Sequence, residues 1–207
     1  MVRVKVCGVT SVEQAMGCVE RGVDAIGVNL IASSLRRVDE ATARAIAQAV
    51  GDAALVVAVV ADLEASAMLS LVHRTGAGCL QLHGSERPED VAAVLPHAYK
   101  AVRVAGRDDV AQAAAMPGDY VMVDAKVAGA LGGTGHSFDW SLVAELAKRR
   151  RLVLAGGLKP DNVETAVATV GPWCVDVASG VESSPGVKDM ARVEAFVRAA
   201  RRAVTPT

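Results

Sequence analysis

Aromatic residues are scarce in this chain: two Trp, two Tyr and two Phe make up 3% of 207 residues, although 52% are hydrophobic. A core must therefore be built from Val, Ala and Leu, and this length suits one sizeable core. An excess of charge of one sign is also lacking, because 22 basic residues stand against 23 acidic ones. We therefore expect neither nucleic acid nor a membrane as a partner. A local phosphate site stays open, since backbone amides bind anions without changing net charge.

Long apolar segments are missing as well. The longest apolar run, residues 53–61, is far shorter than the roughly 20 residues that span a bilayer. The first residues enter a strand-like run without the charged, apolar and cleavage regions of a secretory signal, so we expect a cytoplasmic protein. The cysteines form no CxxC pair, so the sequence predicts neither a zinc site nor a disulfide framework; they are Cys7, Cys18, Cys79 and Cys174.

Strand-like runs alternate with Ala-rich stretches of helical spacing from end to end. The strand candidates are residues 2–6, 25–30, 55–60, 79–82, 98–104, 120–124, 152–154 and 174–177. The helix candidates are residues 11–21, 40–50, 64–74, 88–95, 108–115, 140–150, 162–170 and 189–203. This alternation favours an α/β fold with a parallel sheet and helical crossovers. Because no break in composition divides the repeated units, we predict a single-domain (β/α)8 TIM barrel over residues 1–207 rather than an open sheet.

The first strand candidate has a lysine on one face. Val4 and Val6 share one side, whereas Lys5 and Cys7 share the other, because side chains alternate along a strand. In a barrel the valines would pack outward on helices, and Lys5 and Cys7 would point toward the axis. A buried lysine is costly unless it is paired. We predict that Asp176, on the adjacent eighth strand, is its partner.

A thiol and a carboxyl group stand at the carboxyl ends of two strand candidates, where barrel enzymes place their active sites. Cys7 ends the first and Asp124 the sixth, which makes them candidates for a base and an acid facing one substrate. The alternatives are a buried thiol and a helix-capping or lysine-paired aspartate. A thiol titrates near ~8.5, so a nearby cation or helix N-terminus would have to lower its pKa. Asp124 would need partial desolvation or a neighbouring negative charge to carry a proton.

Glycine-rich loops follow the seventh and eighth strand candidates. Gly156 and Gly157 lie in the first loop, and Ser179 and Gly180 lie in the second. Loops at these two positions commonly bind phosphate in this fold, because glycine lets backbone amides approach an anion. The alternative is that the glycines only form tight turns. Two such loops in adjacent positions favour a phosphate site.

Two basic side chains follow other strands. Of the four histidines, only His83 stands at a strand end, where it would contact substrate or support its loop. Arg36 lies in the loop after the second strand. It would either be a solvated charge or pair with a substrate carboxylate.

Together these motifs resemble the phosphoribosylanthranilate isomerase family, which catalyses the third step of tryptophan synthesis from chorismate. The resemblance spans residues 4–189. The motifs are residues 5–10 (KVCGVT), 81–84 (QLHG), 123–125 (VDA), 132–135 (GGTG) with 138–140 (FDW), 154–158 (LAGGL), 176–182 (DVASGVE) and 185–189 (PGVKD). Each motif alone is weak evidence for the family, but the occurrence of all of them in this order and with barrel spacing is specific to it.

The resemblance implies an Amadori rearrangement of the small molecule N-(5-phosphoribosyl)anthranilate to 1-(2-carboxyphenylamino)-1-deoxyribulose 5-phosphate, with no cofactor and no metal. Asp124 matches the family's acid and Cys7 its base. Arg36 matches the residue that pairs with the anthranilate carboxylate. The remaining matches and expected substrate contacts are Gly156, Gly157, Ser179 and Gly180 for phosphate, and His83 and Asp176 for the rest of the substrate.

The loop after the second strand departs from the family pattern. It lacks the usual aromatic residue, and Leu35 replaces the proline of a Ser-Pro-Arg run. Asp62 stands where the family often has asparagine. These departures bear on substrate affinity more than on reaction type.

Two other enzymes with the same fold fit the sequence less well than the isomerase. The ring-closing decarboxylase of the pathway would need an N-terminal extension, and a histidine-pathway sugar isomerase would have aspartate in place of Cys7. An isomerase with dual tryptophan- and histidine-pathway activity and a non-catalytic sugar-phosphate binder stay open. We expect a monomer, because no apolar helix face is evident beyond those that a barrel needs.

Overall fold

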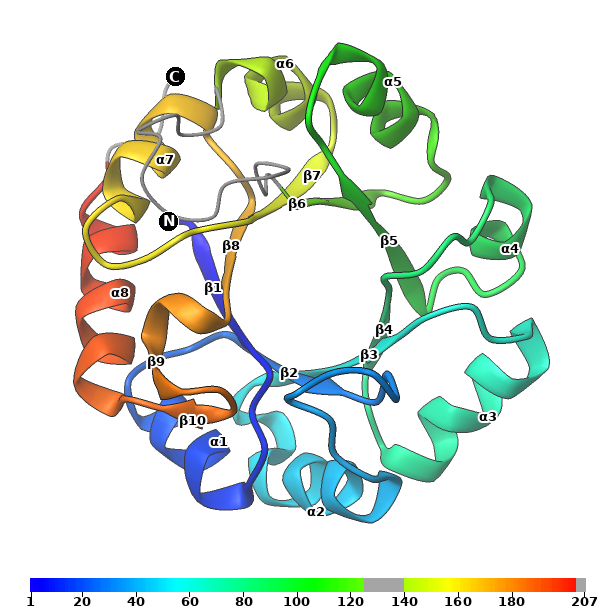
Figure 1. The fold of residues 1–207 in the computed structure, drawn as a ribbon, viewed down its shortest axis with the longest axis vertical. Helices are drawn as coiled ribbons and strands as arrows, with labels where there is room; N and C mark the ends of the chain where they lie inside the picture. Colours follow the sequence, from blue (N-terminus) through cyan, green and yellow to red (C-terminus); the bar gives the residue numbers. More distant parts are fainter. Residues whose placement is uncertain (125–139, 204–207) are drawn as a thin grey trace.

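Eight parallel strands close into a barrel in the computed structural model, which describes residues 1–124 and 140–203 (Figure 1). The strands are β1 (Arg3–Cys7), β2 (Ala25–Asn29), β3 (Leu55–Val60), β4 (Cys79–Leu82), β5 (Ala98–Arg103), β6 (Tyr120–Asp124), β7 (Arg151–Ala155) and β8 (Cys174–Val177). Each strand pairs with the next along the chain, and β1 also pairs with β8, which closes the barrel. The predicted TIM barrel is confirmed.

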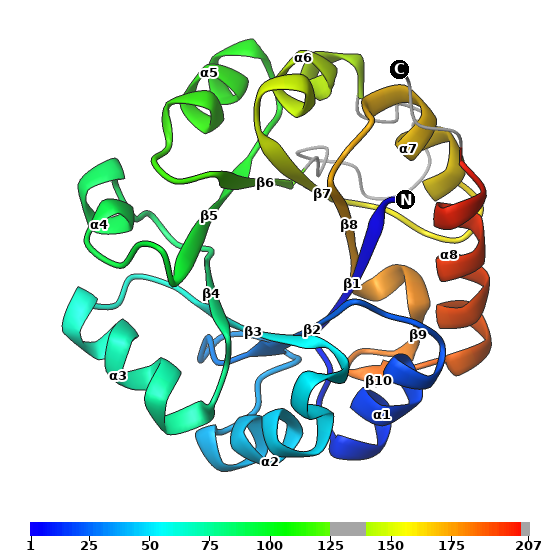
Figure 2. The same ribbon diagram turned by 180° about the vertical axis from the view of Figure 1, so that it is seen from behind.

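Helices surround the barrel on its outside, as both views of the ribbon show (Figures 1 and 2). They are α1 (Val12–Glu20), α2 (Glu40–Val50), α3 (Ala65–Thr75), α4 (Pro88–Ala92), α5 (Arg107–Ala115), α6 (Ser141–Arg149), α7 (Val163–Val170) and α8 (Met190–Arg202). Short 3-10 helices η1 (Gly51–Ala53) and η2 (Ser179–Val181) and a hairpin of β9 (Glu182–Ser184) and β10 (Val187–Lys188) complete the described elements. No helix in these two ranges is long and apolar enough to cross a membrane.

Local sequence signals set several of the helix boundaries. The Ser11 side chain accepts a hydrogen bond from the Gln14 amide at the start of α1, and Asp39 caps α2 in the same way through Thr42. The α4 helix ends at Ala92, three residues before the predicted limit at 95. Pro96 disfavours helical backbone at the residue before it, so Leu95 is excluded from the helix. The β9–β10 hairpin was not predicted.

The two faces of β1 have the predicted orientations. Val4 and Val6 are fully buried in the apolar layer between the strands and the helices. Lys5 lies on the opposite face, in the barrel interior, where its Nζ atom is 2.9 Å from Asp176 Oδ1. The side chains of Lys5 and Asp176 are only 2% and 6% exposed. The predicted ion pair is therefore confirmed.

The ion pair keeps Lys5 charged inside the protein. Burial alone would lower the pKa of Lys5, but the Asp176 carboxylate holds that pKa well above its usual value. The ammonium group also donates a hydrogen bond of 3.0 Å to Gln81 Oε1, which accepts another from the Tyr99 hydroxyl. These contacts satisfy charge and hydrogen-bonding groups that would otherwise be costly to bury.

Replacement of Lys5 by Met tests how much the fold depends on this pair. The substitution leaves Asp176 buried without its cation, so we expect a loss of about 3–5 kcal/mol in the free energy of unfolding. The matched control is Lys148→Met, which breaks the exposed pair of Lys148 with Glu145 and should cost less than about 1 kcal/mol. Equilibrium urea unfolding at pH 7 measures both values. Equal losses in the two variants would contradict the structural role of Lys5.

Candidate active site

A cavity of about 280 Å³ opens at the carboxyl end of the barrel. Every site residue predicted from the sequence lines it. These residues are Cys7, Arg36, His83, Asp124, Gly156, Gly157, Asp176, Ser179 and Gly180. The structure therefore brings together groups that lie as far apart in the sequence as β1 and η2, while their individual roles stay predictions. Motif residues 125, 132–135, 138 and 139 lie outside the described residues.

Cys7 ends β1 and forms part of the cavity wall. Its partner across the strands is Gly27 of β2, and a Cβ atom at Gly27 would lie 2.7 Å from the sulfur. Only glycine leaves this space for the thiol. Burial raises the pKa of Cys7, and Asp176 raises it further, whereas Lys5 and Lys188 lower it. The nearby cation that the sequence analysis required is present, but burial outweighs it, so the neutral thiol dominates at pH 7.

Asp124 ends β6, and His83 follows β4 on the same side of the barrel. His83 Nε2 lies 3.8 Å from Asp124 Oδ2, which is too long for a hydrogen bond. Burial lowers the pKa of His83, as do Arg103 and Lys100, while Asp124 and Asp176 oppose this shift. His83 is therefore neutral at pH 7.

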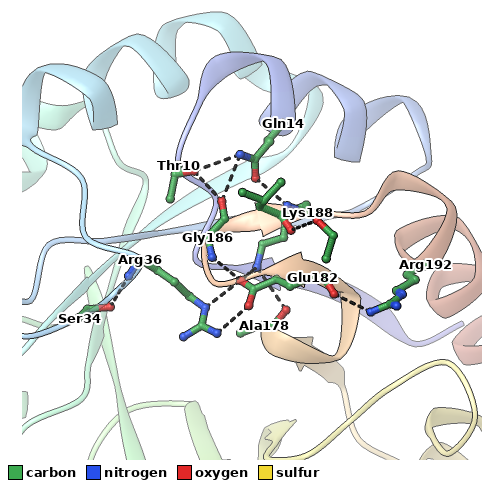
Figure 3. A network of polar contacts seen from close by, with 11 residues as sticks. Thr10, Gln14, Ser34, Arg36, Ala178, Glu182, Gly186, Lys188 and Arg192 are labelled. Atoms are coloured by element: carbon green, nitrogen blue, oxygen red, sulfur yellow. Dashed lines mark hydrogen bonds and ion pairs between the residues drawn. The ribbon is translucent and has the colours of Figure 1, made fainter.

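Arg36 is held by a carboxylate that the sequence analysis did not assign to the site (Figure 3). Its Nε and Nη2 atoms donate to the two oxygens of Glu182 at 2.7 and 2.6 Å. Glu182 Oε1 also accepts from Lys188 Nζ at 2.7 Å. The Lys188 side chain is completely buried and Glu182 is 4% exposed, whereas Arg36 is 24% exposed in the cavity wall. One carboxylate thus lies between two cations, which leaves this network with a net positive charge.

The stem of Arg36 is fixed by its close approach to Gly8. Gly8 has a φ of +73°, and a Cβ atom there would overlap Arg36 Cδ. Glu182 binds the Nε and Nη2 atoms of the guanidinium and makes no hydrogen bond to Nη1. A planar fork held in this way can recognise a second carboxylate by geometry as well as by charge.

The loops after β7 and β8 pack against each other at the cavity. Gly156 and Gly157 have positive φ values of 94° and 64°. A Cβ atom at Gly180 would overlap the carbonyl oxygen of Leu158, so the second loop contacts the first directly through backbone. Ser179 and Gly180 lie in the cavity wall beside them. Backbone that lines a cavity in this way can present amide groups to an anion.

Sequence reasoning missed three buried polar residues that support the site: Gln81, Glu182 and Lys188. Gln81 could have been identified from the sequence, because it is the polar residue at an inward position of β4, between the outward Leu80 and Leu82. Glu182 and Lys188 become register partners only through the unpredicted β9–β10 hairpin. Among the described residues, no group of three or more His, Cys, Asp or Glu side chains is placed to hold a metal ion.

Comparison with known proteins identifies close relatives over nearly the whole chain. The family model described as N-(5'-phosphoribosyl)anthranilate (PRA) isomerase matches residues 4–199. The N-(5'-phosphoribosyl)anthranilate isomerase of Pseudomonas aeruginosa (strain UCBPP-PA14) is 45% identical over 203 residues, which are 97% of this chain and 95% of that protein. The enzyme of the same name from Myxococcus xanthus is 44% identical over 204 residues, covering 97% of this chain and 96% of the relative.

Solved structures agree with the sequence relatives. The phosphoribosyl anthranilate isomerase of Thermotoga maritima superposes with a TM-score of 0.91 at 36% identity. The match covers 98% of this chain and 100% of that structure's chain. A second structure is a phosphoribosyl anthranilate isomerase in complex with reduced 1-(o-carboxyphenylamino)-1-deoxyribulose 5-phosphate. It has a TM-score of 0.88 at 34% identity, with coverage of 98% and 100%.

Proposed function

Because this chain belongs to the N-(5'-phosphoribosyl)anthranilate isomerase family, we propose that Cys7 and Asp124 are the base and the acid of its reaction. The activity itself is that of PRA isomerase, an intramolecular aldose–ketose isomerase of tryptophan biosynthesis. The observation that supports the assignment is that the thiol and the carboxyl group line one cavity, between a fixed arginine and two glycine-rich loops.

We propose three points of contact for the substrate. The phosphate lies against the loops of Gly157 and Gly180, and the anthranilate carboxylate faces the Nη1 side of Arg36. These two anionic groups place the sugar between Cys7 and Asp124. Holding both ends of a substrate aligns the reacting atoms and removes much of the entropic cost of reaction. The same contacts would bind the reduced form of the product, reduced 1-(o-carboxyphenylamino)-1-deoxyribulose 5-phosphate.

The first proposed step opens the sugar ring. Asp124 donates a proton to the ring oxygen while the bond from that oxygen to C1 breaks. The lone pair of the anilino nitrogen forms a C=N bond to C1, which gives an open Schiff base with a positive charge on nitrogen. Proton donation to the departing oxygen avoids an unstable alkoxide, which is the usual contribution of a general acid.

The second proposed step moves a proton from C2. Cys7 takes that proton, the C–H electron pair forms a C1=C2 double bond, and the C=N electrons return to nitrogen. The resulting enolamine then gains a proton at C1 and loses one from the C2 hydroxyl, which yields the ketone. The raised pKa of Cys7 makes its thiolate scarce but strongly basic, while Lys5 and Lys188 lie close enough to stabilise the negative charge.

Replacement of either reacting group tests the acid–base assignment. We expect Cys7→Ser and Asp124→Asn each to lower kcat by about 10²–10⁴-fold, the usual contribution of a positioned proton donor or acceptor. Substrate made in situ from anthranilate and phosphoribosyl pyrophosphate loses its fluorescence on isomerisation, which gives the rate. The controls are Cys18→Ala in α1 and Asp108→Asn on the exposed face of α5. Near-normal turnover in either test variant would show that its assignment is wrong.

We expect Arg36 and Glu182 to affect substrate binding, and therefore KM, through the substrate carboxylate. Loss of a charge-assisted contact costs about 1.5–3 kcal/mol, so Arg36→Ala should raise KM by about 10–100-fold if ground and transition states use it equally. Glu182→Gln should raise KM in the same direction, because it loosens the guanidinium that Glu182 holds at 2.6–2.7 Å.

A substrate made from aniline separates this role from a general loss of structure. It lacks the carboxylate, so its KM in both variants should stay close to that of the unaltered protein. An equal rise in KM for both substrates would contradict the contact between Arg36 and the substrate carboxylate.

A further inference from the structure

A series of polar side chains crosses the barrel interior from β8 to β6. Asp176 contacts Lys5 at 2.9 Å, Lys5 contacts Gln81 at 3.0 Å, and Gln81 contacts His83 at 3.0 Å. His83 in turn faces Asp124 at 3.8 Å. The reaction as described above uses Asp124 but gives no task to Gln81.

The amide group of Gln81 has only one orientation that fits its neighbours. Its Oε1 position lies 3.0 Å from both Lys5 Nζ and the Tyr99 hydroxyl. An ammonium group can only donate, so the atom facing Lys5 must be the oxygen. The Gln81 side chain is 1% exposed, so bulk water does not compete for these contacts.

This orientation determines which ring nitrogen of His83 carries the proton. With Oε1 toward Lys5, the amide nitrogen of Gln81 faces His83 Nδ1 at 3.0 Å. An amide nitrogen only donates, so Nδ1 must accept and therefore has no proton. A neutral imidazole then carries its single proton on Nε2, the atom on the side of Asp124.

We propose that Gln81 is a positioning residue that holds His83 as the neutral Nε2–H tautomer beside Asp124. A second proton on His83 would have to go to Nδ1, which already faces the donor from Gln81. The amide thus opposes formation of an imidazolium by geometry, and the Lys5–Asp176 pair fixes the amide.

The consequence for the reaction rests on the proposed role of Asp124 as the acid. An imidazolium within 4 Å would favour the ionised carboxylate and hinder Asp124 from carrying a proton. Other charged groups face the ring from several elements. Asp124 and Asp176 favour a charged His83, and Lys100 and Arg103 of β5 oppose it. Asp62 and Glu86 line a second cavity, whose wall also includes His83. Gln81 supplies the directional contact that none of these charges provides.

Nitrogen NMR of the unaltered protein with 15N-labelled histidine rings tests the tautomer without any activity measurement. The His83 signals are assigned by their loss in His83→Asn. At pH 7 we expect a protonated-type shift for Nε2 and an unprotonated-type shift for Nδ1. A proton found on Nδ1, or on both nitrogens, would overturn the proposal.

Gln81→Glu reverses the contact, because a carboxylate beside Nδ1 accepts instead of donating. We expect the proton to move to Nδ1, the pKa of His83 to rise by about 1–3 units, and the alkaline limb of the kcat–pH profile to shift to lower pH. Gln48→Glu, at an exposed position on α2 that lies outside the cavities around His83, adds the same charge and should leave all three values unchanged. An unaltered tautomer and pKa in Gln81→Glu would overturn the proposal.

The two measurements separate this inference from the proposed acid. A changed tautomer with an unmoved pH profile would support the positioning role of Gln81 and count against Asp124 as the acid. Gln81→Met removes the donor without adding a charge, and its His83 should populate both tautomers. A single Nε2–H tautomer in Gln81→Met would show that Gln81 is not what selects it.

Discussion

The Lys5–Asp176 ion pair in the barrel interior is the contact on which the site depends. A lysine that is 2% exposed is tolerated only because a carboxylate lies 2.9 Å away and Gln81 accepts another of its hydrogen bonds. The two residues are also register partners of β1 and β8, and Asp176 lines the cavity. The pair therefore sets the surroundings of Cys7, two residues further along β1, and the orientation of the amide that reaches His83.

A second network holds Arg36 in the wall of the site. Glu182 lies between Arg36 and Lys188, and the β9–β10 hairpin carries both Glu182 and Lys188. A lone Arg–Glu pair would be neutral and would compete with a substrate carboxylate, whereas the additional buried lysine restores a positive charge. Burial of a carboxylate between two cations thus leaves Arg36 both rigid and attractive to an anion.

Much of this arrangement follows from simple rules of sequence. Alternation along β1 predicts that Lys5 and Cys7 face inward, and the order of the strands makes Asp176 a neighbour. The nine predicted site residues meet in one cavity because parallel strands carry their carboxyl ends to one face of the barrel.

Other features depend on contacts that no local pattern encodes. The orientation of Arg36 depends on Glu182, which is remote in sequence and positioned by an unexpected hairpin. Whether the pKa of Cys7 is raised or lowered depends on the balance between burial of the thiol and the charges of Lys5 and Lys188. A sequence gives neither the depth of burial nor the distances from the sulfur to the two lysines. Gln81 was visible as an inward polar residue, but its effect on His83 requires the positions of Lys5 and Tyr99.

In the proposed reaction, Cys7 and Asp124 act on one sugar held between Arg36 and the glycine-rich loops. A crystal structure of this chain with reduced 1-(o-carboxyphenylamino)-1-deoxyribulose 5-phosphate is the direct test of this arrangement. We expect C2 of the sugar at about 3.5 Å from the Cys7 sulfur, with the phosphate at the loops of Gly157 and Gly180. A sugar bound with C2 away from Cys7, or with its phosphate on Arg36, would contradict it.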